Sequence, residues 1–171
     1  AELDNTFDVI VCKALIRDNM TGENKGYLDK IHSENIHRDL LREKCYVAYD
    51  VTIIRKARLM EIGLLDETCP SMQEWDTHIR LSKDARYKII DETLCEWVVG
   101  EEDAISKNHN KHDAGMLYIY HKHVCDFRKY AYRHFLRALS NMWDQVDNSQ
   151  RLLKLAPELL LYIPLRKFLS R

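Results

Sequence analysis

The segment SMQEWDTHIRLS, residues 71 to 82, contains a carboxylate whose position raises a chemical question. Ser71 stands where a helix N-cap is expected, and Glu74 follows three residues later, which is the capping-box pattern. In one interpretation Glu74 only caps its own helix. In the other it is a carboxylate that does chemistry. The two roles are compatible, because a helix N-terminus favours an ionised carboxylate, so the local pattern leaves both open.

The polar neighbours of Glu74 have simpler explanations. Trp75 is expected to pack in the core. Asp76 and Arg80 lie four residues apart, which predicts an exposed ion pair along one helix. Asp66 and Glu67 precede the segment and are interpreted as turn-forming residues beside the helix.

Two close pairs of histidines suggest a metal site. They are His109 with His112 and His121 with His123. A two-residue offset on a helix points side chains apart, and no carboxylate or cysteine completes a convincing ligand set. We therefore expect His121 and His123 to be one solvated residue and one packing residue.

Composition limits the classes of protein to consider. The chain has 171 residues, of which 46% are hydrophobic and 31% charged, as expected for one globular domain with a real core. Lys and Arg number 26 against 27 Asp and Glu, which argues against a general nucleic-acid binder. The low counts of 5 Gly and 3 Pro favour helices over an all-β sandwich.

The cysteines and hydropathy indicate a compartment. Five cysteines, an odd number without a C-x-x-C spacing, are typical of reduced thiols rather than of a disulfide scaffold: Cys12, Cys45, Cys69, Cys95 and Cys125. No apolar run reaches the roughly 18 to 20 residues of a spanning helix, and the opening AELDNTFD does not resemble a signal peptide. We expect a cytoplasmic protein.

The elements that would position Glu74 follow from pattern. Strands are expected over 6–18, from 45 through Ile54, and as two short runs within 85–100. Helices are expected over 33–44, capped by Ser33, over 55–63, ending at Gly63, and from the capped segment onward. Residues 101–113 read as a polar loop. Residues 114–145 are helical, and the tail forms two helices broken at Pro157 and Pro164.

These elements predict a mixed α/β or α+β fold. The sheet has three or four strands and is followed by an all-helical C-terminal extension. A sheet this thin with apolar strands suggests that something else pairs with it. The expected division is 1–112 for the α/β part and 113–171 for the helical extension.

At residues 49–82 the chain resembles the second half of the catalytic domain of family-2 glycosyltransferases, inverting enzymes of GT-A fold. A strand ending in IIRK is followed by a helix, by a Gly-x-x-Asp-Glu turn at residues 63–67, and by an acidic pair beside a tryptophan at residues 73–76. That helix ends in Arg80-Leu81. The AISKN turn at 104–108 and YHKH at 120–123 also resemble the family, so the similarity covers roughly residues 7 to 140.

The resemblance implies transfer of a sugar from a nucleotide-diphosphate donor to an acceptor hydroxyl with inversion, in polysaccharide or glycolipid synthesis. Glu74 occupies the position of the general base, which accepts the proton of the attacking hydroxyl. The acceptor-side or supporting residues would be Asp66, Glu67, Trp75, Asp76 and Arg80. A divalent cation, Mn²⁺ or Mg²⁺, offsets the charge on the leaving diphosphate.

The departures from the family are specific. Its metal-binding Asp-x-Asp motif occurs nowhere in this sequence, and its nucleotide-binding half is missing. We therefore expect a fragment of a longer enzyme, inactive alone. Many relatives carry a further histidine ligand after the last strand. Here WVVGEED, residues 97 to 103, has none, and His109 and His112 are the nearest candidates.

The tail supports a second function. LLKLAPELLLYIPLRKFLSR is apolar with basic residues at intervals, so residues 151–171 either pack on their own domain or lie on an anionic membrane surface. The alternative to the enzyme is accordingly a non-catalytic α+β interaction module whose helical tail binds a partner protein or a membrane. A helical metal-binding regulator is a third alternative.

Overall fold

A computed structural model describes residues 6–28, 35–45, 47–100, 109–143 and 149–169. The chain divides into two compact units, Ala1–Gly115 and Met116–Arg171. The first unit is a sheet with helices, and the second is helical. The prediction of a mixed α/β protein with a few-stranded sheet and helices following it is confirmed.

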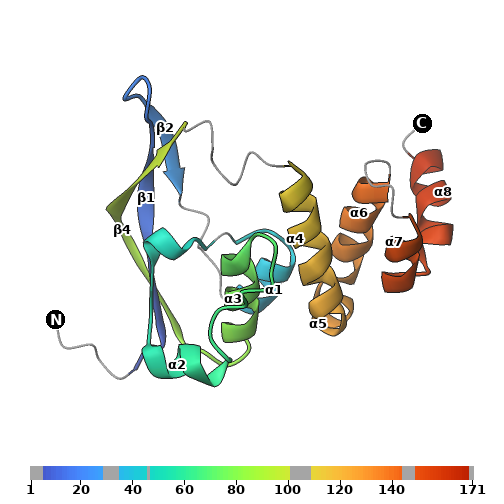
Figure 1. Cartoon of the computed structure of the whole chain (residues 1–171), viewed down its shortest axis with the longest axis horizontal. Coiled ribbons are helices and arrows are strands. Elements are labelled where there is room, and N and C mark those ends of the chain that lie inside the picture. The colour runs from blue at the N-terminus through green and yellow to red at the C-terminus, as the bar shows by residue number, and fades with distance from the viewer. Residues whose placement is uncertain (1–5, 29–34, 46, 101–108, 144–148, 170–171) are drawn as a thin grey trace. The chain divides into compact units, whose positions relative to one another are not determined.

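The sheet of the first unit is organised around β1 (Val9–Asp18). β4 (Tyr87–Val99) pairs in parallel along the whole of β1. β3 (Thr52–Ile54) and β2 (Asn24–Leu28) pair antiparallel with the first and second halves of β1, so these two share its other edge. The sheet is therefore mixed, with four strands among the described residues (Figure 1).

β4 is one strand of 13 residues, and the prediction of two short strands over 85–100 was wrong. Its register against β1 shifts twice: Val11 pairs with Ile89, Lys13 with Thr93 and Ala14 with Cys95. Bulges of this kind place extra residues in one strand. They absorb the polar stretch at 91–93, which had suggested a break, and Asp91 there forms an ion pair with Lys13.

β2 was not predicted, and residues 45–54 are largely not a strand. β2 forms a hairpin with β1, whose turn is held by Asp18 Oδ1 accepting hydrogen bonds from the amides of Met20 and Thr21 at 2.9 and 3.0 Å. Within the described part of 45–54, residues Tyr49–Val51 form a 3₁₀ helix, η1, and β3 is the assigned strand. The Thr52 hydroxyl donates to Ala48 O across η1 at 2.6 Å, which favours the turn.

Three helices lie to one side of the sheet in Figure 1, or at its end: α1 (Ile36–Leu41), α2 (Lys56–Glu61) and α3 (Gln73–Leu81). Asn35 caps α1, accepting from Arg38 N at 3.0 Å, while the expected cap Ser33 lies outside the described residues. α2 ends as predicted, with Gly63 at φ +82 just beyond it. The fully buried side chains of this unit include Val9, Val11, Leu40, Leu41, Ile79 and Leu81.

The second unit is helical. Its elements are α4 (His109–Lys122), which starts in the first unit, α5 (Val124–Tyr130), α6 (Tyr132–Trp143), α7 (Ser149–Leu155) and α8 (Leu159–Leu169). Tyr120, Phe127 and Phe135 form its aromatic core, with ring centroids 4.8 to 5.5 Å apart.

Two predictions for these helices need correction. Residues 101–113 were expected to be a loop; 101–108 lie outside the described residues, but α4 already begins at His109. Pro157 does separate α7 from α8, whereas Pro164 lies inside α8 and does not end it. Proline removes one backbone hydrogen bond there, and the apolar residues of α8 continue the helix through it.

Gly115 sets how closely α4 approaches the loop before α3. A Cβ at this position would lie 2.2 Å from Ser71 Oγ and 2.7 Å from Ser71 O. Ser71 Oγ also donates to Lys111 O, one turn earlier in α4, at 2.8 Å. The glycine is therefore required by the contact rather than by its backbone conformation.

We expect Gly115→Ala to lower the free energy of unfolding by about 1 to 3 kcal/mol, the usual cost of overpacking. The carbonyl of Ser71 cannot rotate away, so Ser71→Ala in the same chain should not restore stability. Urea unfolding of the single and double variants measures both. Helix propensity alone favours alanine by about 1 kcal/mol, and a stabilised Gly115→Ala would contradict the close contact.

Candidate functional site

The N-terminus of α3 differs from the predicted capping box. Its N-cap is Met72, in the left-handed region at φ 61 and ψ 35, and no side chain caps it. The hydroxyl of Ser71 instead donates a hydrogen bond to Lys111 O. The capping-box prediction was wrong because the packing of this loop against Gly115 determines where Ser71 points.

Glu74 is consequently the second residue of α3 rather than the third after a serine cap. Its side chain is half-buried. It lies in the first turn, where backbone amides and the helix dipole favour a negative charge. The arrangement gives a partly accessible carboxylate in the first turn of the helix.

Tyr49 is linked to α3 through Thr77, and the charge of Glu74 acts on it. Tyr49 Oη and Thr77 Oγ1 are 2.8 Å apart. Burial raises the pKa of Tyr49, and the negative charge of Glu74 raises it further. The phenol therefore stays protonated and can donate a hydrogen bond. The sequence did not reveal Tyr49, because residues 45–54 were interpreted as a strand rather than as the turn that contains it.

Asp76 is fully buried, although it was expected to be exposed. The predicted pairing with Arg80 is present: Nε and Nη2 of Arg80 each lie 2.9 Å from Asp76 Oδ2. Arg80 Nη1 also donates to Ile62 O and Leu64 O at 2.6 and 2.8 Å. The pair that was predicted to lie on the surface is therefore buried, and its arginine ties α3 to the loop after α2.

The other predicted site residues have structural roles. Trp75 is buried, as expected, and its Nε1 donates to Leu40 O at 3.0 Å. Asp66 Oδ1 accepts from the amide and hydroxyl of Thr68 at 2.9 and 2.7 Å, a turn-stabilising arrangement. Glu67 is exposed. The structure thus gathers Glu74, Tyr49 and Thr77 around the start of α3, while Asp66 is engaged within its own turn.

The histidines follow the simpler expectation where they are described. His121 is exposed and His123 is buried, with Nδ1 3.8 Å from Asp126 Oδ2. His112 is exposed, 3.4 Å from Asp113 Oδ1, and the side chain of His109 lies outside the described residues. Among described side chains, no group of three or more His, Cys, Asp or Glu residues is arranged to hold a metal ion.

His78 is an ionisable residue of α3 that sequence reasoning missed. It is fully buried, its Nδ1 lies 2.9 Å from Tyr87 Oη, and its Nε2 has no hydrogen-bond partner in the described structure. Burial lowers the pKa of His78 to about 4. The imidazole is therefore neutral in the folded chain.

Three comparisons with known proteins gave no relationship: no family model, curated protein or solved structure matches the chain.

The burial of the Asp76–Arg80 ion pair can be tested by its effect on stability. Replacing Arg80 with Met removes the cation from a buried carboxylate, and we expect a loss of ~3 kcal/mol or more in the free energy of unfolding. Asp76→Leu combined with Arg80→Met should recover much of that loss. Denaturant unfolding measures both. A loss below ~1 kcal/mol for Arg80→Met would instead fit a solvated pair.

His78 gives a pH test. Between pH 6.5 and about 4 the unfolded chain binds a proton at His78 and the folded chain does not, so stability falls as pH is lowered through that window. This difference in proton binding at His78 changes the free energy of unfolding by roughly 3 kcal/mol in total. The full stabilisation is present above pH 6.5.

The matched control for that test is His78→Leu with Tyr87→Phe, which removes both hydrogen-bond partners. Carboxylates with lowered pKa values, such as Asp8 and Asp18, also weaken the fold in acid, and they are present in both proteins. The difference between the two urea titrations isolates His78. Identical pH profiles would show that His78 is protonated without cost.

Proposed function

We propose that this chain is the acceptor-side, C-terminal portion of an inverting GT-A glycosyltransferase, in which Glu74 is the general base. The intact enzyme would transfer a sugar from a nucleotide-diphosphate donor to an acceptor hydroxyl. The observation that carries the proposal is the position of Glu74. It is a half-buried carboxylate in the first turn of α3.

The chain's own residues suit the proton-transfer step. The Glu74 carboxylate accepts the proton of the acceptor hydroxyl as its oxygen attacks the anomeric carbon. The Tyr49 hydroxyl, positioned by its hydrogen bond with the buried Thr77, would help to orient an acceptor alcohol. Arg80 forms an ion pair with Asp76, so the second carboxylate of the segment is already engaged by a cation.

The loop between α2 and α3 fits an acceptor-facing role. Leu64 and Leu65 expose 53% and 44% of their surface, and Leu64 takes a left-handed backbone at φ 65. Arg80 holds the Leu64 carbonyl from α3. An apolar loop fixed to the helix that carries the base would offer a surface to the less polar part of an acceptor.

The divalent cation of the family does not fit the residues described here. The sequence lacks Asp-x-Asp, and the described side chains include no metal-holding group. No step of the proposal therefore passes through a cation bound to this chain, and donor and cation binding are assigned to sequence outside it.

The second candidate, an interaction module acting through its helical tail, is favoured by one feature of α8. Leu160 and Leu161 expose 61% and 81% of their surface. Adjacent exposed leucines suit contact with a partner or with a membrane surface. In the part of the chain that the structure describes, no helix has both the length and the apolar character needed to cross a bilayer.

The two candidates are separated by expressing the whole reading frame that contains this chain. The enzyme proposal requires an Asp-x-Asp motif in parallel-strand sequence before Ala1, and release of UDP, GDP, CDP or dTDP from a nucleotide sugar in the presence of Mn²⁺. A full-length protein without that motif, and without release from any of the four donor classes, would favour the interaction module.

In the active full-length protein, we expect Glu74→Gln to lower turnover by about 10²-fold or more, because the amide keeps the shape but cannot accept the proton. Donor binding should be nearly unchanged. Glu92→Gln on β4 is the matched control, since Glu92 is an exposed carboxylate away from α3. Activity of Glu74→Gln close to that of Glu92→Gln would remove Glu74 from the mechanism.

A further inference from the structure

Two cysteines meet on one face of the sheet. Ala14 of β1 pairs with Cys95 of β4, and Cys12 lies two residues before Ala14 on the same face of β1. Cys12 Sγ and Cys95 Sγ are 3.6 Å apart, in van der Waals contact. Both are free thiols.

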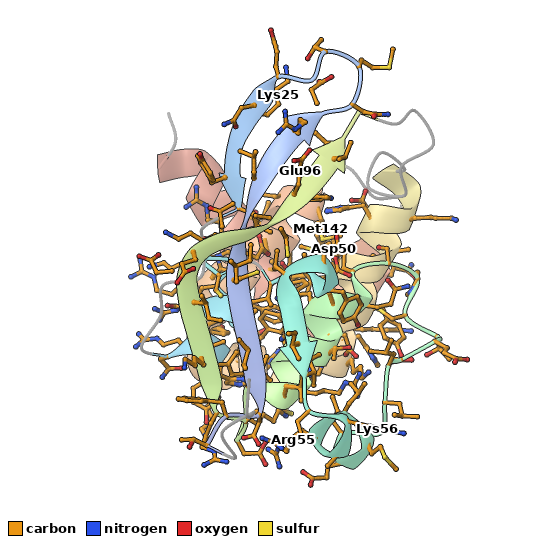
Figure 2. The ribbon with its side chains drawn as sticks, turned by 90° about the vertical axis from the view of Figure 1, so that its left-hand side faces the viewer. Lys25, Asp50, Arg55, Lys56, Glu96 and Met142 are labelled. Carbon is orange, nitrogen blue, oxygen red and sulfur yellow. The ribbon has the colours of Figure 1, made fainter. Side chains whose placement is uncertain are left out.

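The same two thiols hold the turn η1. Cys12 Sγ lies 3.7 Å from Val51 O, and Cys95 Sγ lies 3.4 Å from Asp50 O. Figure 2 shows Asp50 in this turn, beside the sheet, and Glu96, the residue after Cys95, on β4. Each thiol therefore has a carbonyl acceptor in one three-residue segment, as well as the other sulfur within contact distance.

We propose that Cys12 and Cys95 form a redox site that a hydroperoxide oxidises reversibly to a disulfide linking β1 to β4. Bond formation needs the sulfur atoms to close from 3.6 Å to the ~2.0 Å of a disulfide. Side-chain rotation supplies most of this movement, because the sulfurs already face each other.

The two cysteines differ in solvent exposure, and this difference assigns different roles to their sulfurs. Cys95 is partly exposed and Cys12 is buried. Burial and the adjacent Cys95 raise the pKa of the Cys12 thiol, which makes it the slower nucleophile toward an external oxidant. Cys95 is therefore the residue that meets the hydroperoxide, and Cys12 is the residue that resolves the product.

The chemistry balances in two steps. The Cys95 thiolate attacks the terminal oxygen of the hydroperoxide, the O–O bond breaks, and Cys95 becomes a sulfenic acid while the oxidant leaves as water or an alcohol. The Cys12 sulfur then attacks Cys95 Sγ. The S–S bond forms, the S–O bond breaks, and the hydroxyl leaves as water with the Cys12 proton. A dithiol reverses the reaction by exchange.

The other cysteines are not arranged for this reaction. Cys69 is buried, with Sγ 3.0 Å from Ser71 O. Cys45 is buried, and its burial raises its pKa to about 11. Cys125 is exposed and lies in the second unit. Cys12 with Cys95 is the pair of thiols that the structure places in contact among the described residues.

Oxidation has a structural consequence for η1. A disulfide has no S–H group, so Asp50 O and Val51 O lose their sulfur donors. Tyr49, in the same turn, is bonded to Thr77 near Glu74. Oxidation should therefore loosen the side of the site that η1 provides. Only this last link rests on the proposed function; the disulfide does not.

The test uses the folded chain with Cys125→Ser, which removes the exposed thiol that would link two molecules. We expect limiting hydrogen peroxide to give one intramolecular disulfide. Digestion without reductant and mass spectrometry should join the peptides of Cys12 and Cys95, and dithiothreitol should separate them. Free thiols, or a disulfide between any other pair, would overturn the proposal.

A trapping experiment distinguishes the two sulfurs. In Cys12→Ser the sulfenic acid on Cys95 cannot be resolved, so dimedone should label Cys95, whereas Cys95→Ser should show little label on Cys12. Equal labelling in both variants would contradict the assigned roles.

Hydrogen exchange measures the structural consequence without any change of Cys12 or Cys95. Amides of residues 49–53 should exchange about twofold faster or more after oxidation. If the full-length protein releases no nucleotide from a sugar donor but the disulfide still forms, only the proposed function is contradicted. If the disulfide does not form, only the redox site is contradicted.

Discussion

Burial of the Asp76 carboxylate constrains the first unit, because a buried charge requires a partner. Arg80 supplies it from the next turn of α3, and the same guanidinium reaches the carbonyls of Ile62 and Leu64. One cation therefore fixes both the helix and the loop that precedes it. The helix that carries Glu74 has little freedom to rotate, since rotation would separate Arg80 from the carbonyls of Ile62 and Leu64 and expose Trp75.

The start of α3 shows how packing replaces local capping. Met72 takes a left-handed conformation that costs a non-glycine residue about 1 kcal/mol or more, while Ser71 is held against α4. The loop accepts this strain because Gly115 permits the close approach and because Trp75 and Ile79 bury the face of α3 that follows. What results is a first turn whose carboxylate is positioned by the tertiary structure.

Elements dominated by apolar periodicity could be predicted from sequence: β1, α2 with its glycine end, the core positions of Trp75 and Ile79, and the helical character after residue 114. Features that depend on partners distant in the chain could not. β2 exists because β1 is beside it, the bulges of β4 depend on the register with β1, and Ser71 is redirected by a glycine 44 residues away. The spacing predicted the Asp76–Arg80 pairing but not its burial. The surroundings of Tyr49 and His78 and the Cys12–Cys95 contact depend on segments that are distant in the chain. The relationship to glycosyltransferases remains a proposal.

The long strand β4 also affects the tendency of the purified chain to self-associate. It pairs with β1 along one edge, and no second strand pairs with it among the described residues, so its other edge presents backbone donors and acceptors to neighbouring molecules. Leu94 and Val98 are exposed on the same strand. Asp91 and Glu96 are paired with Lys13 and Arg17, while Glu92 provides a charge that discourages strand addition. Salt screens that charge. Self-association of purified chain should accordingly increase with ionic strength, and preparative work is better done in dilute, low-salt buffer.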